Sequence, residues 1–226
     1  MTAKNIKDYL NKGVRRLRHR KGFGVHSPFA FSIITDVIEE RSAYYAYSEM
    51  YRIYGAKTPI SFKVACLLLR LANRFRARQI LEVSCDGGYS VLPILLTDSR
   101  NAMVTVADQQ QQTDTLNILS NHKQLIGQLS FCESLSSVSD DYKADMIIVS
   151  SLPSGFTQQE LAQWVFSHTH ETSLIFVKGI QPKRPLVDFW DSFCDNESVE
   201  ITMDLYDYGL AIRRPRFYKQ HYVVSF

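Results

Sequence analysis

The sequence predicts an α/β protein: a mostly parallel sheet flanked by helices, with an antiparallel hairpin at its C-terminal edge and a helical N-terminal extension. Three observations lead to this fold class. From residue 79 onward, short apolar runs typical of buried strands alternate with segments of helical periodicity, which is the pattern of βαβ units. The last three apolar segments are joined by short connections, which favour antiparallel neighbours. Residues 1–56 carry patterns that we interpret as helical, so we divide the chain into an extension, 1–56, and a sheet domain, 57–226.

The elements of the sheet domain follow in alternating order. Helices are predicted at 90–97, 110–120 and 157–169 and after Pro185, and the third begins with a capping box, Thr157-Gln-Gln-Glu160. Before the first strand, Ser27-Pro28 and Thr58-Pro59 each indicate an N-cap followed by proline at the first helical position. Strands are predicted at about 79–84, 103–107, 128–132, 145–150, 173–178, 199–205, 208–212 and 220–226.

Composition favours a cytoplasmic globular protein. The 226 residues are 45% hydrophobic and 22% charged, which is ordinary for one large α/β domain with a substantial core. The four cysteines are scattered without metal-binding spacing, so we interpret them as reduced thiols in a reducing compartment. The N-terminus has no apolar signal region and no apolar run approaches 18 residues, so we expect neither secretion nor a membrane span.

The charge is unevenly distributed. Residues 1–21 contain eight Lys or Arg against the single Asp8, a net +7, so the rest of the chain carries −4 of the overall +3. Such a segment could grip nucleic acid or an anionic surface. Apolar residues at helical spacing favour a solvated amphipathic helix instead, and we expect no nucleic-acid partner. These apolar residues are Ile6, Leu10, Val14 and Leu17.

The stretch 79–90 is typical of a ligand-binding strand, turn and helix. Ile80, Leu81 and Val83 form a short apolar run, Asp86-Gly-Gly88 follows it, and a helix is expected from Ser90. In doubly wound proteins this arrangement cradles nucleotide-like ligands, because glycine permits close approach of the backbone. An ordinary βα turn has the same pattern, so two adjacent glycines alone do not decide between the two interpretations.

Aromatic residues and one histidine mark the N-terminal extension. Tyr44, Tyr47, Tyr51 and Tyr54 would line one face of a helix, where they either stack on a ligand or pack on the core. We favour packing. His26, in the glycine-containing segment before the first expected helix, is either a ligand-facing group or a structural residue.

Three sequence motifs carry a resemblance to a known family. They are Gly-Val-His-Ser-Pro-Phe at 24–29, Asp-Leu-Tyr-Asp-Tyr-Gly-Leu at 204–210 and Lys-Gln-His-Tyr at 219–222. Together with the order of elements from about Gly24 to Phe226, they resemble a bacterial branch of the class I S-adenosylmethionine-dependent methyltransferases. That resemblance implies a Rossmann-like core and S-adenosylmethionine as cofactor.

The resemblance also implies which residues would hold the cofactor. Glu82 matches the acid that ends the family's first strand, while Gly88 and Ser90 match the later glycine and the hydroxyl of its loop. Ser84 stands where the first glycine usually lies. Asp108 matches the acid that accepts both ribose hydroxyls, although it would equally serve as a helix N-cap. Other expected contacts come from the loop and from the ends of later strands: Gly87, Glu133 and Ser150.

The fourth and fifth strands depart from the family's pattern. Ser150-Ser151 and Lys178-Gly-Ile180 stand where relatives have carboxylates, some of which coordinate a divalent cation, so we expect no metal ion. Lys178 and His26 are the two candidate general bases.

Two functional hypotheses follow from the resemblance. The first is a metal-independent methyltransferase acting on a small molecule or another soluble acceptor. The second is a degenerate relative without catalysis, which uses the fold for binding or assembly. The sequence predicts no particular oligomeric state.

Overall fold

A single eight-stranded sheet forms the centre of the molecule, in the order β3-β2-β1-β4-β5-β7-β6-β8. The computed structural model describes residues 24–55 and 57–226. The predicted α/β fold class is confirmed: the sheet is mostly parallel, carries helices on its faces and ends in an antiparallel region near the C-terminus. The strands are β1 (Gln79–Val83), β2 (Ala102–Val106), β3 (Leu129–Cys132), β4 (Ala144–Val149), β5 (Thr169–Lys178), β6 (Ile201–Asp204), β7 (Tyr208–Ile212) and β8 (Gln220–Val223).

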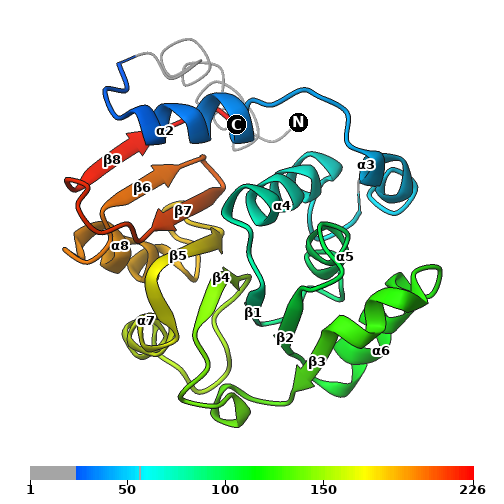
Figure 1. Ribbon diagram of the computed structural model, residues 1–226. Helices are drawn as coiled ribbons and strands as arrows, with labels where there is room; N and C mark the ends of the chain where they lie inside the picture. The colour runs from blue at the N-terminus through cyan, green and yellow to red at the C-terminus, as the bar shows by residue number, and fades with distance from the viewer. Residues whose placement is uncertain (1–23, 56) are drawn as a thin grey trace.

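Helices cover both faces of the sheet, so that the molecule has three layers. Figure 1 shows α4 and α5 on one side of the sheet and α7 and α8 on the other. The α-helices are α2 (Pro28–Ile33), α3 (Tyr45–Met50), α4 (Phe62–Phe75), α5 (Val91–Leu95), α6 (Gln109–Ile118), α7 (Gln158–Ser167) and α8 (Val187–Asp195). The other helical turns are η1 (Ile34–Ile38), η2 (Lys123–Gln128) and η3 (Leu135–Ser137).

The C-terminal strand does not pair as its short connection suggests. β7 is antiparallel to both β5 and β6, and these two neighbours occupy both of its edges. β8 therefore adds outside β6 and pairs with it in parallel, with Ile201 opposite Gln220 and Asp204 opposite Val223. The short connection sets the direction of β8 relative to β7, while the occupied edge decides which strand it pairs with.

The core lies in two apolar layers separated by the sheet. Successive residues of β4 alternate between them: Met146 and Ile148 pack beneath α4 and α5, whereas Ile147 and Val149 pack beneath α7 and α8. This period of two is the geometry of a strand with both faces buried, and it explains why β4 is apolar throughout.

The N-terminal elements share the first of these layers. Ala30, Ile33, Val37 and Met50 are buried against α4, as expected for helices that pack on a sheet domain. Ser27 caps α2 by accepting a hydrogen bond from the Ala30 N–H, which confirms the cap predicted there.

The predicted start of the next helix at Thr58-Pro59 is wrong by one turn. Ser61 is the N-cap of α4. Thr58 instead closes the preceding turn, because its hydroxyl donates to the carbonyls of Gly55 and Ile60. Hydroxyl side chains form such local turns as readily as they form caps, so the sequence alone did not separate the two.

The tyrosines at 44–54 pack largely on Phe62, as favoured from their spacing. Tyr47 and Tyr54 contact its ring, and Tyr51 does so while remaining 71% exposed. The helix α3 is shorter than the spacing suggested, since a turn follows Met50. The predicted basic helix at 1–21 lies outside the described residues.

Candidate functional site

The carboxyl ends of β1, β4 and β5 lie side by side, and a buried ion pair joins the outer two. Lys178, the last residue of β5, places its Nζ 2.6 Å from Asp86 Oδ2 in the loop after β1. The same Nζ lies 3.0 Å from Ser90 Oγ, and Ser90 donates from its hydroxyl and its backbone N–H to the two oxygens of Asp86. The side chains of Asp86 and Lys178 are only 5% and 12% exposed. These contacts fix the loop against the end of β5.

The loop itself runs through left-handed backbone conformations. Ser84 has φ +63°, which is costly for a residue with a side chain, and Gly87 and Gly88 have φ +78° and +93°. A Cβ on Gly88 would lie 2.8 Å from the Cα of Thr115 on α6. Gly88 is therefore required by packing between the loop and α6, a reason that the sequence did not reveal.

Glu82 is buried beneath this loop without a charged partner in contact. Its side chain has no exposed surface, and its Oε2 accepts a 3.3 Å hydrogen bond from Thr105 of β2. Burial, followed by repulsion from the Asp86 carboxylate, raises the pKa of Glu82 to about 8, against the opposing attraction of Lys178. Glu82 is thus mainly a neutral acid near pH 7.

The N-terminal elements reach this edge through Tyr54. Its hydroxyl donates to the carbonyl of Tyr89 at 2.7 Å, and the two rings meet edge to face with centroids 5.9 Å apart. Burial raises the pKa of Tyr54, and the nearby Asp86 carboxylate adds to the effect. Tyr54 therefore remains a neutral hydrogen-bond donor that ties the N-terminal elements to the loop.

Asp108 follows β2 and caps α6, so the helix-cap interpretation holds for one of its oxygens. Asp108 Oδ1 accepts from the Gln111 N–H at 2.8 Å, and Gln111 Oε1 accepts from the Asp108 N–H in return. Gln111 also donates to the carbonyl of Cys85, which connects the cap to the loop after β1. No described residue donates to Asp108 Oδ2, and the residue is exposed. One carboxylate oxygen thus remains for a ligand.

The other predicted cofactor residues lie at the ends of their strands. Ser150 follows β4 and donates its backbone N–H to the carbonyl of Val83, beside Ser84. Glu133 is exposed directly after β3. Two buried side-chain atoms at this edge, Glu82 Oε1 and Ser150 Oγ, lack a hydrogen-bond partner among the described residues. Buried polar atoms are normally paired, so these two mark a place where polar contacts are still to be made.

The two candidate bases are not brought together. His26 is exposed and precedes α2, whose Phe29 contacts Phe75 and Phe217. These two residues come just before β1 and β8, at the edge where the parallel strands begin. Lys178 lies at the opposite edge, where its Nζ is paired with Asp86.

Sequence reasoning missed the residues that hold the loop in place. Asp86 was noted only as a turn residue, although the Asp86-x-x-x-Ser90 spacing allows an acid to cap the following turn. The Asp108-x-x-Gln111 capping box was readable in the same way. The pairing of Asp86 with Lys178 had no local signal, because 92 positions separate them.

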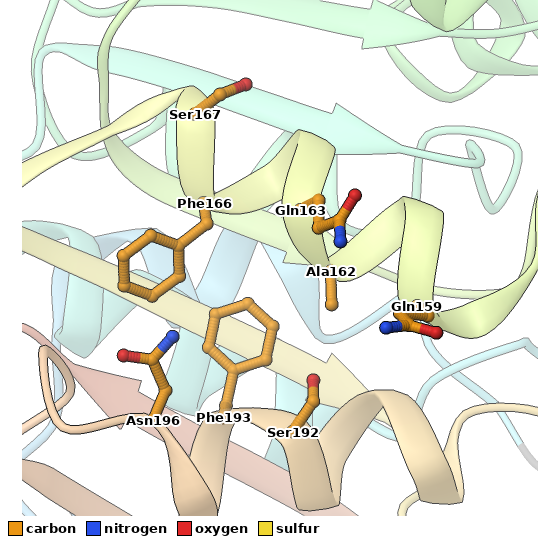
Figure 2. Close-up of a pocket in the computed structure, with 8 residues that line it drawn as sticks. All are labelled: Gln159, Ala162, Gln163, Phe166, Ser167, Ser192, Phe193 and Asn196. Atoms are coloured by element: carbon orange, nitrogen blue, oxygen red, sulfur yellow. The ribbon is translucent and has the colours of Figure 1, made fainter.

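A hollow lies away from this edge, between α7 and α8. Figure 2 shows Phe166 and Phe193 facing each other across it, with ring centroids 5.9 Å apart. The cleft has a volume of about 530 Å³ and includes no ionisable side chain. The cleft is lined by Gln159, Ala162, Gln163, Phe166, Ser167, Ser192, Phe193 and Asn196.

Residues 24–55 and 57–226 contain no group of three or more His, Cys, Asp or Glu side chains placed to hold a metal ion. None of their helices combines the length and apolar character needed to cross a membrane.

The architecture and the carboxyl-edge loop define a fold similar to that of class I S-adenosylmethionine-dependent methyltransferases. No protein-family model matches the chain, and no curated protein matches its sequence. Among solved structures, it is similar to the methyltransferase PaMTH1 of Podospora anserina bound to S-adenosylhomocysteine (SAH), at 14% identity and a TM-score of 0.58, covering 83% of this chain and 96% of that chain.

Two O-methyltransferases show the same similarity. TomG of Streptomyces achromogenes, in complex with S-adenosylmethionine, matches at 16% identity and a TM-score of 0.56, over 76% of this chain and 91% of that chain. The O-methyltransferase from Bacillus cereus in complex with SAH matches at 16% identity and a TM-score of 0.58, over 81% and 96%. At such identities the likeness establishes the fold.

Proposed function

We propose that this protein is a methyltransferase that uses S-adenosylmethionine to methylate a small molecule or another soluble acceptor without a metal ion. The observation that carries the proposal is a pair of acids at the carboxyl edge: Glu82 on β1, just before the glycine loop, and Asp108, just after the neighbouring strand β2. Open α/β sheets bind their ligands at this edge. The fold similarity to methyltransferases seen with S-adenosylmethionine or SAH supports the same ligand class.

The residues present fit such a ligand. Asp108 Oδ2 is open to accept a ribose hydroxyl, and a charge-assisted hydrogen bond of this kind is strong. Glu82 Oε1 and Ser150 Oγ are buried polar atoms in need of partners. Glu133, exposed after β3, is the proposed contact for the base.

Bound S-adenosylmethionine would supply a methyl group activated for transfer by its sulfonium charge. The protein's contribution would be orientation and exclusion of water. Tyr54 holds the N-terminal elements over the loop, and Lys178 holds the loop against β5. The residues at the ends of β4 and β5 are Ser150, Ser151 and Lys178, so these positions supply no carboxylate for a metal ion.

Calorimetric titration of the full-length protein with S-adenosylmethionine and with SAH tests the proposal. We expect both ligands to bind at one site per chain. Absence of binding of either ligand at millimolar concentration would reject the function.

Asp108 provides the residue-level test. Asp108→Asn keeps an oxygen for the α6 cap and removes the charge, so it should weaken binding of both ligands by at least ~1.5 kcal/mol. Asp108→Ala should weaken binding similarly and also lower the free energy of unfolding by ~1 kcal/mol through loss of the cap. Thr157→Ala, which removes the cap of α7, should lose stability but keep ligand affinity. Affinity unchanged in Asp108→Asn would contradict the assignment.

A second candidate is a non-catalytic relative that uses the fold for binding or assembly. Two observations favour it: Ser84 occupies a strained left-handed position in the loop, and the Asp86–Lys178 pair closes the loop onto β5. This candidate predicts that neither ligand binds, so the same titration separates it from the first.

A further inference from the structure

The ion pair between Asp86 and Lys178 crosses the end of β4, a strand that contains neither residue. β4 lies between β1 and β5, so Lys178 reaches past the end of β4 to meet Asp86. Each has the other as its ion-pair partner in the described part of the chain. The pair therefore places one negative and one positive charge at the edge where the proposed cofactor would bind.

The acid buried beneath the loop, Glu82, adds little charge beside this pair. Glu82, two residues before the loop turns at Ser84, is fully buried and mainly neutral near pH 7 for the reasons given above. Asp86, Lys178 and Glu82 thus sum to about zero. An uncompensated Lys178 ammonium would repel a cationic ligand, and the neighbouring Asp86 carboxylate offsets that repulsion.

Because Asp86 and Lys178 are buried, the charge balance between them is sensitive to substitution of either residue. With side-chain exposures of 5% and 12%, Asp86 and Lys178 are largely removed from water, so salt screens their effects weakly. Removing one partner would leave the other uncompensated in the same place. A ligand that differs from another only by one charge would report that change.

We propose that Asp86 and Lys178 are opposed specificity-determining residues, which together set the preference of this site between cationic S-adenosylmethionine and SAH, its counterpart without the sulfonium charge. Asp86 favours the cation and Lys178 opposes it. The inference rests on the proposed function. It assigns Lys178 a role in holding a charge balance in place of a role as general base.

The test is the ratio of the dissociation constant for SAH to that for S-adenosylmethionine, measured by calorimetry. Lys178→Gln leaves Asp86 uncompensated and should raise this ratio by about tenfold or more. Asp86→Asn leaves the ammonium uncompensated and should lower it by about tenfold or more. The double variant removes both charges and should return the ratio to within about threefold of wild type. Lys178→Met replaces Lys178→Gln if the latter does not fold.

A matched control removes a lysine at the other edge. Lys143 directly precedes β4 and donates to the backbone carbonyls of Asp140 and Ser167. Lys143→Gln changes the net charge as Lys178→Gln does and should leave the ratio at the wild-type value.

The outcomes distinguish a failure of the charge-balance proposal from a failure of the proposed methyltransferase function. If single variants bind SAH but keep the wild-type ratio, the charge balance is rejected while the function stands. If wild type binds neither ligand, both are rejected. A double variant whose ratio stays as far from wild type as one of the single variants would show that loop distortion, and not charge, causes the change.

Discussion

Ser84 and Gly88 adopt left-handed backbone conformations in the same loop for different physical reasons. Gly88 lies so close to Thr115 that any side chain would collide with the backbone of α6. Ser84 has space for its side chain but carries the cost of a positive φ, of order 1–2 kcal/mol. The neighbouring hydrogen bonds of Asp86 to Ser90 and Lys178 hold the loop in this form. The backbone strain at Ser84 is thus offset by the hydrogen bonds that Asp86 makes in the same loop.

Glu82 gives the stability of the protein a defined pH dependence. Its pKa is about 8 in the folded state, against the ordinary glutamate value of 4.5 in the unfolded chain. The stability that neutral Glu82 provides is complete below pH 4.5 and is lost as the pH rises through about 8, because only the unfolded chain is then freely ionised. Between about pH 5 and pH 8.5, wild type should therefore lose stability relative to Glu82→Gln, by at least ~1 kcal/mol.

Urea denaturation at both pH values measures this difference. Glu133→Gln, which alters an exposed acid at the end of β3, should follow wild type. If the stabilities of wild type and Glu82→Gln change in parallel with pH, Glu82 is not buried as a neutral acid.

At the scale of elements, α8 packs so closely on β7 that the contact leaves no room for a side chain at Gly209. A Cβ on Gly209 of β7 would lie 2.4 Å from the ring of Trp190 on α8. Trp190 is only 4% exposed, so its ring is enclosed by the protein. The glycine in the motif at 204–210 is therefore required by the helix that covers it, which gives a structural reason for one residue of that motif.

Gly209→Ala should destabilise the protein by ~1–3 kcal/mol, because the added methyl group overpacks the layer between α8 and the sheet. Thermal or urea unfolding provides the measurement. Gly127→Ala is the matched control, since a Cβ there has nothing within 4 Å, and its unfolding should change by no more than ~0.5 kcal/mol. Equal stabilities of the two variants would show that Trp190 moves aside freely.

At the scale of the whole molecule, the N-terminal elements and the sheet form one apolar layer. A buried arginine on α4 reinforces this connection: Arg70 donates to the carbonyls of Val37 and Ile38 at the end of η1 and to the hydroxyl of Tyr47. Carbonyl groups at the end of a helix attract cations, so the guanidinium satisfies several acceptors at once. We expect residues 24–55 to unfold together with the sheet.

Arg70→Met should test this cooperation. The variant keeps most of the side-chain volume but leaves buried acceptors without donors, so it should lower the free energy of unfolding by at least ~2 kcal/mol. Arg74→Met, one turn further along the same helix and exposed, should change it by less than ~0.5 kcal/mol. A separate early transition in Arg70→Met would instead show that the N-terminal elements unfold independently.

Local patterns predicted much of this molecule, and long-range packing accounts for the rest. The strand positions, the Ser27 cap and the Thr157–Glu160 capping box were predictable because hydrophobic period and cap chemistry are properties of neighbouring residues. The pairing of β8 with β6 was not predictable from the sequence, because it depends on which strand edges are already occupied by other strands.

The same distinction applies to the candidate site. The sequence placed Glu82, Ser150 and Lys178 at strand ends, where the structure has them. It did not reveal that Lys178 meets Asp86, because no periodicity links residues on strands that are brought together only by the sheet order β1-β4-β5. That contact changes the predicted chemistry of Lys178.

The Asp86–Lys178 contact also has an evolutionary consequence. A buried charge that loses its partner is costly, so neither residue is free to change alone. In related chains the two positions should therefore exchange as a pair: an acid at the position of Lys178 should accompany a neutral or basic residue at the position of Asp86. The residues at these two positions should then be correlated among related sequences, even where neither the lysine nor the aspartate is present.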